Sequence, residues 1–181
     1  MPASAVLLFE DEIILRLFPV LRRAWSPKGE AATVGVTGQN AKQVLFGAIN
    51  VRTGRRTILQ GTNMSQSGFQ DFLRLLRSSY QNRSVWVLLD GASCHTAPKS
   101  KALAETLHIE LIWLPKQCPE LNAMDHLFKE VKSNICANYQ YRTIDEHAAT
   151  AEKYILQLTN KQAQIKAGLL SKNFWLKSFF K

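Results

Sequence analysis

The segment SVWVLLDG at residues 84–91 constrains the fold more than any other part of this chain. It is a near-continuous apolar run of strand length, which is typical of a strand that is covered on both faces of its sheet. A short helix is predicted after it, at about residues 97–107, and a second apolar strand, IELIWLP, follows at residues 109–115. This succession of strand, helix and strand indicates parallel strands joined by a right-handed crossover. The chain therefore needs a sheet with helices packed against it.

The remaining patterns add three strands and several helices to this core. Residues 5–12, AVLLFEDE, predict a buried strand that ends in acids, and residues 42–61 alternate around a Thr53-Gly54 turn, as in a hairpin. Apolar residues at helical spacing predict further helices. These helices cover residues 65–82, the segment around Asp125, and residues 144–160. The expected fold is an α/β architecture with a mixed five-stranded sheet flanked by helices.

Length and charge set the first limits on function. The sequence predicts one domain over residues 1–181, in which residues 161–181 form a basic tail rich in aromatic side chains. Lys and Arg outnumber Asp and Glu by 23 to 14, and the resulting net charge of +9 favours a polyanionic partner. The three cysteines form no CxxC pair, which suits a reducing cytosol better than a disulfide framework. Residues 3–9 are apolar, but they lack a basic leader and are too short to span a membrane, so no membrane association is expected.

Two acidic residues end buried strands. Asp11 continues the strand face that carries Leu7 and Phe9, where a charge is unfavourable unless something pairs with it. The alternative for Asp11 is a turn residue at the end of the strand. Asp90 follows the apolar run directly, and sites in open α/β sheets gather at the carboxyl ends of strands. Asp90-Gly91 is also a hairpin signal, but no partner strand follows it.

A third acid, Asp125, lies near the start of a predicted amphipathic helix, behind a loop bracketed by Pro115 and Pro119. Two local roles are open to it. Asn122 and Asp125 have a spacing like that of a capping box, and Asp125 and Lys129 form an i,i+4 pair worth about 0.2–0.5 kcal/mol. Neither role explains the stiff loop that leads into the helix.

Together, the three acids suit phosphodiester chemistry. Two divalent cations about 3.5–4 Å apart can clamp the attacking and leaving oxygens of an in-line displacement. Carboxylate oxygens suit Mg²⁺, with Mn²⁺ as a substitute. Three clustered carboxylates would repel one another without cations. We therefore expect a site for two divalent ions.

Three motifs resemble, in this order, the carboxylate motifs of the DDE/D transposases of the mariner-like superfamily, particularly its bacterial insertion-sequence branch. The motifs are FEDE at residues 9–12, VLLDGASCHTA at residues 87–97 and WLPKQCPELNAMDHLFKEVK at residues 113–132. The separation of Asp90 and Asp125, 125 − 90 − 1 = 34 residues, agrees with that group. The resemblance covers about residues 5–145. It implies a ribonuclease-H-like fold and Mg²⁺-dependent DNA cleavage and strand transfer, with transposon ends and target DNA as partners.

Carried over motif by motif, the resemblance implies that Asp11, Asp90 and Asp125 are the catalytic acids and bind the metal ions. Asp125 stands where the insertion-sequence branch usually has glutamate, and Gly91 stands where an asparagine often follows the second acid. The family also carries an N-terminal helix-turn-helix region, so we expect a catalytic domain alone, either truncated or joined to a first reading frame by frameshifting. Synapsis of two DNA ends implies a homodimer in the active complex. The expected location is the bacterial cytoplasm, in association with the nucleoid.

Other residues are candidates for supporting roles. His95 matches a histidine common in the second family motif, and it either acts near the scissile phosphate or stabilises its loop by a hydrogen bond. Glu12 points to the opposite strand face from Asp11, which suits a supporting or an exposed charge. Trp25 is expected to pack in the protein rather than to stack on a base. The candidate phosphate contacts are basic side chains; they are Arg22, Arg23, Lys28, Lys116, Lys129 and Lys132.

Two other functions stay open on the sequence alone. A catalytically weak or inactive remnant of a transposase would keep the fold and the basic surface as a DNA-binding or regulatory protein, but the retention of all three acids favours the enzyme. A different ribonuclease-H-like nuclease, such as a resolvase, is disfavoured by the PELNAMD context at residues 119–125.

Overall fold

The computed structural model describes residues 5–180. Residues 3 and 4 of the apolar segment at the start of the chain, and Lys181 of the predicted tail, lie outside the described residues. The strands are β1 (Val6–Arg16), β2 (Lys42–Asn50), β3 (Arg56–Gly61), β4 (Val85–Leu89) and β5 (Ile109–Trp113). The helices are α1 (Gln66–Ser79), α2 (Ser93–Thr96), α3 (Pro98–Thr106), α4 (Ala123–Asn134), α5 (Ile144–Gln157) and α6 (Asn160–Lys166), with short 3-10 helices η1 (Pro119–Leu121) and η2 (Lys177–Phe180).

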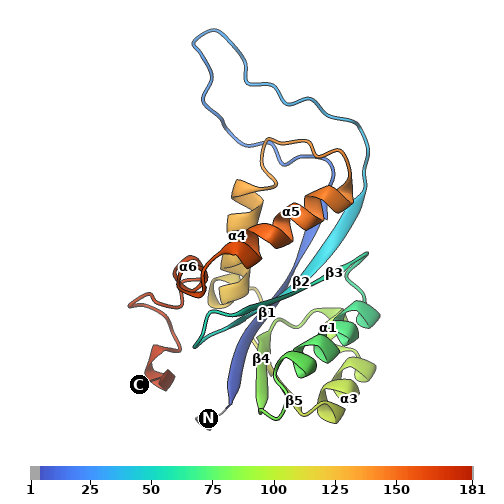
Figure 1. Cartoon of the computed structure of the whole chain (residues 1–181), viewed down its shortest axis with the longest axis vertical. Coiled ribbons are helices and arrows are strands. Elements are labelled where there is room, and N and C mark those ends of the chain that lie inside the picture. The colour runs from blue at the N-terminus through green and yellow to red at the C-terminus, as the bar shows by residue number, and fades with distance from the viewer. Residues whose placement is uncertain (1–4, 181) are drawn as a thin grey trace.

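The five strands form one mixed sheet in the order β3-β2-β1-β4-β5 (Figure 1). β1 runs parallel to β4, and β4 runs parallel to β5, as the two apolar runs and their crossover predict. β2 and β3 form the predicted hairpin and add to the other side of β1 in antiparallel pairing. The structure thus confirms the mixed five-stranded α/β architecture.

Helices cover both faces of this sheet (Figure 1). One face carries Phe9 and Ile13 of β1 and packs against α4, α5 and α6. The other face carries Leu8 and Phe46 and packs against α1 and α3. β1 is central to both cores because its side chains alternate between the two faces. Within the described part of the chain, no helix is both long and apolar enough to cross a membrane.

β1 is longer than the sequence predicts. The acids at positions 10–12 were expected to end it, but the strand continues to Arg16. Ile13 and Leu15 keep the apolar alternation going and are 1% exposed, and β2 pairs with β1 as far as Arg16. β4 pairs only with Val6–Phe9, so the second half of β1 is bound on one side alone. Asp11 therefore lies inside a strand and not at its end.

Gly47 lets α4 approach the sheet closely beside Asp11. Gly47 of β2 is the direct cross-strand partner of Asp11, so the two residues share a face. A Cβ atom at Gly47 would lie 2.6 Å from Met124 Cε and 2.7 Å from Phe128 Cζ of α4. Only a residue without a side chain leaves room for the helix at this point.

The helix predicted at about residues 97–107 is present as α3, which begins at Pro98, and the short helix α2 precedes it as an addition to the predicted elements. One residue of a connecting segment differs from expectation. Trp25 was expected to pack, but its side chain is fully exposed. It lies in the long segment between β1 and β2, which projects beyond the helices in Figure 1, away from any core that would bury it.

The C-terminal tail docks on its own domain over the residues that the structure describes. The rings of Phe174 and Trp175 each lie 6.2 Å from the ring of Phe9 in edge-to-face geometry. Trp175 Nε1 donates a hydrogen bond to the carbonyl oxygen of Leu121, 3.1 Å away. The tail thereby packs against η1, directly before α4.

Candidate active site

Asp11, Asp90 and Asp125 line one cavity of about 210 Å³. They reach it from three different elements, namely the middle of β1, the residue after β4 and the first turn of α4. The rest of the wall comes from the segment between β5 and α4, including Leu114, Pro115 and Pro119. The Pro-bracketed loop, which no local role of Asp125 explained, thus forms one side of this cavity.

The register of the sheet places Asp11 level with Asp90. β1 and β4 are parallel, and Phe9 is paired with Leu88. Two residues further along each strand, the chain reaches Asp11 and Asp90, which therefore lie on the same face. β4 has ended at Leu89 while β1 continues, so the two carboxylates meet where the parallel part of the sheet opens.

Asn122 fixes the start of α4 and with it Asp125. Its side chain accepts a hydrogen bond from the Met124 amide (3.0 Å) and donates one to the carbonyl oxygen of Glu10 in β1 (2.8 Å). Asn122 is thus the N-cap, as the sequence suggests, and it also ties the helix to the strand. The amide of Asn122 donates to the carbonyl oxygen of Pro119, so Asp125 does not complete a capping box.

The predicted pair of Asp125 and Lys129 is present. Lys129 Nζ lies 2.7 Å from Asp125 Oδ2, but without the geometry of a hydrogen bond, and this buried oxygen accepts no hydrogen bond from the part of the chain described here. Because the Lys129 side chain is exposed, the pair contributes little to stability. Asp125 Oδ2 is therefore a buried carboxyl oxygen at the cavity, and its ion pair with the exposed Lys129 is weak.

The electrostatics of the first two acids differ. Burial raises the pKa of Asp11 to about 7, and the neighbouring charges of Glu12, Asp125 and Asp90 add to the effect, while a backbone hydrogen bond from Glu12 opposes it. The pKa of Asp90 is instead lowered by the hydrogen bond from His95, despite partial burial. Asp11 is therefore partly protonated near neutral pH, whereas Asp90 is ionised.

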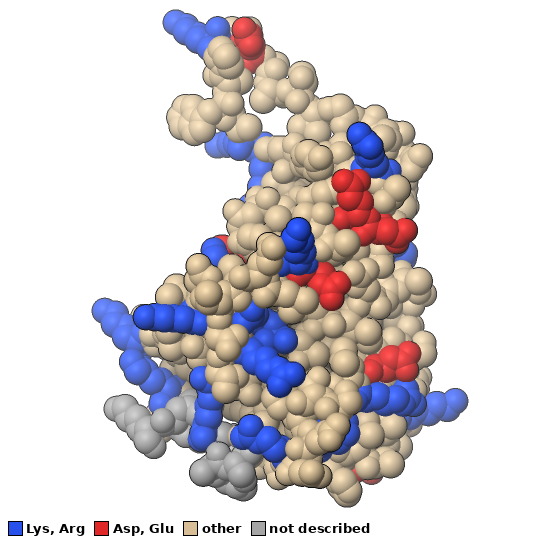
Figure 2. Space-filling model, viewed as in Figure 1, with Lys and Arg blue, Asp and Glu red and all other residues tan. Residues whose placement is uncertain are grey.

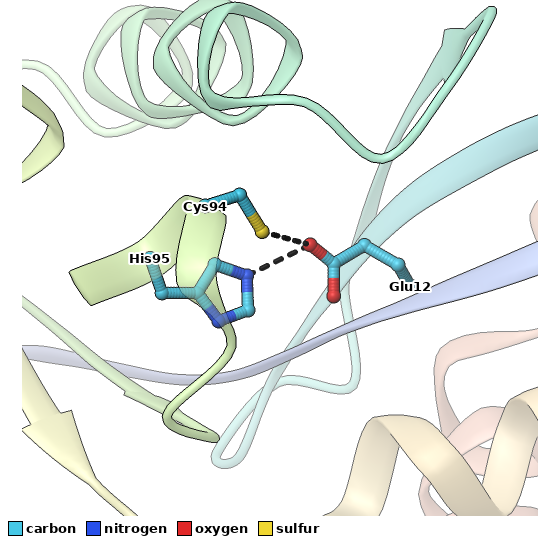
Figure 3. A group of neighbouring side chains, drawn as sticks. All are labelled: Glu12, Cys94 and His95. Atoms are coloured by element: carbon cyan, nitrogen blue, oxygen red, sulfur yellow. Dashed lines mark hydrogen bonds and ion pairs between the residues drawn. The ribbon is translucent and has the colours of Figure 1, made fainter. Parts of the chain in front are cut away.

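Behind Asp90, on the opposite face of the sheet, lies a buried group of polar side chains (Figure 3). His95 Nδ1 is 3.0 Å from Asp90 Oδ1, and His95 Nε2 is 2.7 Å from Glu12 Oε1 and 3.5 Å from Glu10 Oε2. Burial by itself would lower the pKa of His95, but Glu10 and the other partners raise it, so the ring is cationic. Burial raises the pKa of Glu10 well above its usual value, and the charge of Glu12 adds to this.

The sequence anticipates this group only in part. Alternation along β1 places Glu10 and Glu12 together, away from Asp11, but it does not show that helices cover that face. Glu10 is completely buried, and the Glu12 side chain is only 4% exposed, so Glu12 is a supporting residue and not a surface charge. The histidine meets the loop-stabilising expectation through its bond to the Asp90 carbonyl oxygen, at 3.2 Å.

The residues at the cavity fit a divalent cation. Three carboxylates supply hard oxygen ligands of the kind that Mg²⁺ and Mn²⁺ prefer, and one of those oxygens, on Asp125, is buried without a hydrogen bond. Over residues 5–180, the ligand atoms of Glu12, Cys94 and His95 all lie within 4.8 Å of one another, whereas the three aspartates surround the cavity at wider spacing.

The basic candidates lie on the surface. The exposed residues Arg22, Arg23 and Lys28 belong to the projecting segment between β1 and β2, and the Arg22 guanidinium also donates to Ser133 Oγ at 2.7 Å. Lys116 lies in the loop after β5, while Lys129 and Lys132 are exposed on α4. In Figure 2, Lys and Arg side chains gather over the region where Figure 1 places α6 and the C-terminal segment. The charge of the chain is therefore unevenly spread over this face.

Comparison with known proteins agrees with this geometry. Residues 6–147 match the family described as DDE superfamily endonuclease. The "Insertion element IS630 uncharacterized 39 kDa protein" of Shigella sonnei is 26% identical over 134 residues, which are 73% of this chain and 39% of that protein. The crystal structure of a pre-cleavage Mos1 transpososome superimposes with a TM-score of 0.69 at 18% identity, covering 90% of this chain and 52% of that chain.

The catalytic domain of Mos1 mariner transposase has the same fold, with a TM-score of 0.60 at 17% identity over 90% of this chain and 76% of that one. The predicted ribonuclease-H-like fold is thereby confirmed, and the family match agrees with the predicted resemblance to DDE enzymes. The chain spans less than two thirds of the insertion-element protein and of the transpososome chain. Because the family match extends over most of its length, this chain belongs to the DDE superfamily endonuclease family.

Proposed function

We propose that this chain is the catalytic domain of a transposase, in which Asp11, Asp90 and Asp125 bind Mg²⁺ or Mn²⁺ for DNA cleavage and strand transfer. One observation carries the proposal: three acids that are far apart in sequence line the same cavity at the open edge of the sheet. The Mos1 relatives include a strand transfer complex and paired-end complexes with Mg and with Mn. Those names describe Mos1, and they support the proposal by likeness of fold and family.

The three acids have different tasks in this mechanism. Two bound divalent ions would stabilise the charge that develops on the attacking and leaving oxygens of the phosphodiester. Asp11, whose pKa is raised to about 7, would hold a cation as the deprotonated carboxylate. Asp90 Oδ1 faces His95 and the Ala92 amide, which would leave Oδ2 as the oxygen for a cation. Asp125 would offer its buried Oδ2, and the exposed Lys129 would then be available to a DNA phosphate.

The partners follow from the same proposal. Transposon ends and target DNA would lie over the cavity, within reach of Lys116, Lys129 and Lys132, while the projecting segment supplies Arg22, Arg23 and Lys28. Because strand transfer joins two ends to one target, the active complex is a homodimer. An inactive DNA-binding remnant is the alternative, and it would keep the basic surface without the cleavage activity.

Nicking of supercoiled plasmid DNA tests the proposal. The 181-residue chain should nick the plasmid with Mn²⁺ or Mg²⁺ and not with EDTA, and Asp90→Asn should reduce the rate at least a hundredfold while leaving salt-dependent DNA binding unchanged. The matched control is Asp71→Asn, which removes an exposed acid on α1, remote from the cavity, and should nick like the wild type. Equal nicking by wild type and Asp90→Asn would refute the assignment. DNA binding without nicking by the wild type would favour the remnant.

A further inference from the structure

Three consecutive acids on β1 serve two different faces of the sheet. Asp11 faces the cavity, whereas Glu10 and Glu12 face α2 and are enclosed there with His95, which is 1% exposed. Figure 3 shows Cys94 and His95 projecting from α2 toward Glu12 on β1. This group lies outside the cavity, yet it contacts one of the cavity acids directly through His95.

The His95 ring joins β1 to Asp90. Its Nε2 lies 2.7 Å from Glu12 Oε1, and its Nδ1 lies 3.0 Å from Asp90 Oδ1. Both ring nitrogens therefore lie within hydrogen-bond distance of a carboxylate oxygen. A hydrogen bond in which one partner is ionised belongs to the stronger class of such bonds.

The surroundings hold this ring still. The ring of Phe69 from α1 packs against it at a centroid distance of 4.4 Å. Ser100 Oγ donates to the carbonyl oxygen of Cys94 at 2.7 Å, which fixes the short α2 helix. Asp90, in contrast, has a 61% exposed side chain at the end of a strand. A fixed ring is thus hydrogen-bonded to an exposed carboxylate, whose Oδ1 also accepts a hydrogen bond from the Ala92 amide.

The distances favour hydrogen bonds over a second metal site in this group. Glu12, Cys94 and His95 have the ligand types of a zinc site. Two ligand atoms that are each about 2.0–2.1 Å from a tetrahedral ion lie about 3.3 Å apart. The 2.7 Å between His95 Nε2 and Glu12 Oε1 is shorter and matches a hydrogen bond. The Cys94 thiol, 3.6 Å from the same oxygen, adds a weak donor.

We propose that His95 is a positioning residue for DNA cleavage: anchored by Glu12, its ring holds Asp90 Oδ1 so that Oδ2 is presented to the cations in the cavity. The inference rests on the proposed function, because it assigns to His95 the orientation of a metal-binding acid. Loss of a side chain that orients a metal ligand weakens metal binding or activity by about 10–100-fold. The same range is expected here.

Two substitutions of His95 separate this role from a structural one. In His95→Asn, the side-chain amide reaches the position of Nδ1, so the bond to Asp90 is kept and the bond to Glu12 is lost. In His95→Gln, the amide reaches the position of Nε2, so the bond to Glu12 is kept and the bond to Asp90 is lost. Both variants remove the same charge from the same buried group, which matches their structural effects.

Mn²⁺ binding to the 181-residue protein is measured by calorimetry, with plasmid nicking as a second readout. His95→Gln should bind Mn²⁺ about 10–100-fold more weakly than the wild type, and His95→Asn within about threefold of it. Equal Mn²⁺ affinities of the two variants would overturn the positioning role. Mn²⁺ binding without nicking by the wild type would refute the proposed function alone, and no Mn²⁺ binding by the wild type would refute both.

A measurement on the wild type covers the case in which both variants fail to fold. With ¹⁵N-labelled histidine, Mg²⁺ should shift the Nδ1 resonance of His95, which faces Asp90. The buried ring of His147, which contacts Cys136 and Tyr141, is the internal control and should not shift. No response of the His95 Nδ1 resonance to Mg²⁺ would contradict the proposal. A stoichiometric zinc ion in the purified protein would equally overturn it in favour of a metal site at this group.

Discussion

Replacing Asp11 with asparagine should stabilise the metal-free protein. The pKa of Asp11 is raised from 3.8 to about 7 in the folded state, chiefly by burial. At pH 8 the carboxyl is ionised whether the chain is folded or not, so this difference in pKa destabilises the fold by about 4 kcal/mol. Asparagine has a similar shape and no charge. The free energy of unfolding should therefore rise by up to about 4 kcal/mol at pH 8 in Asp11→Asn.

The gain should shrink as the pH falls. Between pH 3.8 and about 7 the folded state binds the Asp11 proton more tightly than the unfolded state, so wild-type stability falls as pH rises through this interval and levels off above it. At pH 5 the penalty is only about 2 kcal/mol, because the carboxyl is ionised only in the unfolded state and the pH lies little more than one unit above its pKa there. The amide does not titrate. The advantage of Asp11→Asn should thus drop from about 4 to about 2 kcal/mol between pH 8 and pH 5.

Urea unfolding in EDTA, followed by tryptophan fluorescence, measures this difference. Glu10, whose pKa is also raised, titrates in both proteins and largely cancels from the comparison. Asp71→Asn removes an exposed acid and should change stability by less than about 0.5 kcal/mol. Saturating Mn²⁺, at 100 times its dissociation constant, should stabilise the wild type by about 2.7 kcal/mol and leave Asp11→Asn unaffected. An Asp11→Asn protein that is less stable than the wild type at pH 8, or a gain that does not vary with pH, would refute the reasoning.

Two further changes test the packing around the site. Gly47→Ala should lower the free energy of unfolding by about 1–3 kcal/mol, because the new methyl group would lie 2.7 Å from Phe128 Cζ. The control Gly35→Ala has open space around it and should change the free energy of unfolding by less than about 1 kcal/mol. Similar unfolding energies for the two variants would contradict the close approach of α4. Arg56→Met should cost about 2–3 kcal/mol, because the half-buried guanidinium donates to acceptors in the β2–β3 turn and at the junction of α5 and α6. Arg74→Met, on the exposed face of α1, should be nearly neutral in the same urea titration.

The order of the elements and the meeting of the three acids could be predicted because local patterns encode them. The apolar run of β4 and the hairpin turn before β3 fix the sheet, and Asp90 follows the carboxyl end of β4, the kind of place where sites in α/β sheets gather. The end of β1 could not be predicted, since it depends on how far β2 continues to pair with it. The alternation of apolar residues predicted the correct face for Asp11, although Asp11 was wrongly expected at the end of the strand.

The burial of Glu10, Glu12 and His95 behind Asp90 could not be predicted from local sequence patterns, for a different reason. Glu10 and Glu12 look like surface charges until α2 and the loop that carries it cover them, and that cover depends on residues about 80 positions away. Trp25 shows the opposite error. A large aromatic residue suggests burial, but burial needs a second layer, and the segment between β1 and β2 has none over this side chain.

Gly47 has a consequence for the accuracy of folding. β1 carries three consecutive acids. If β1 were paired with β2 one position out of register, a carboxylate would therefore still lie at the cavity. Such a slip would also turn every side chain of β1 to the wrong face. It would set Phe46 or Ala48 opposite Asp11 in place of Gly47, so the glycine that admits α4 would no longer adjoin Asp11. Because Gly47 has no side chain, α4 can dock beside Asp11 only when β1 and β2 are paired in the correct register.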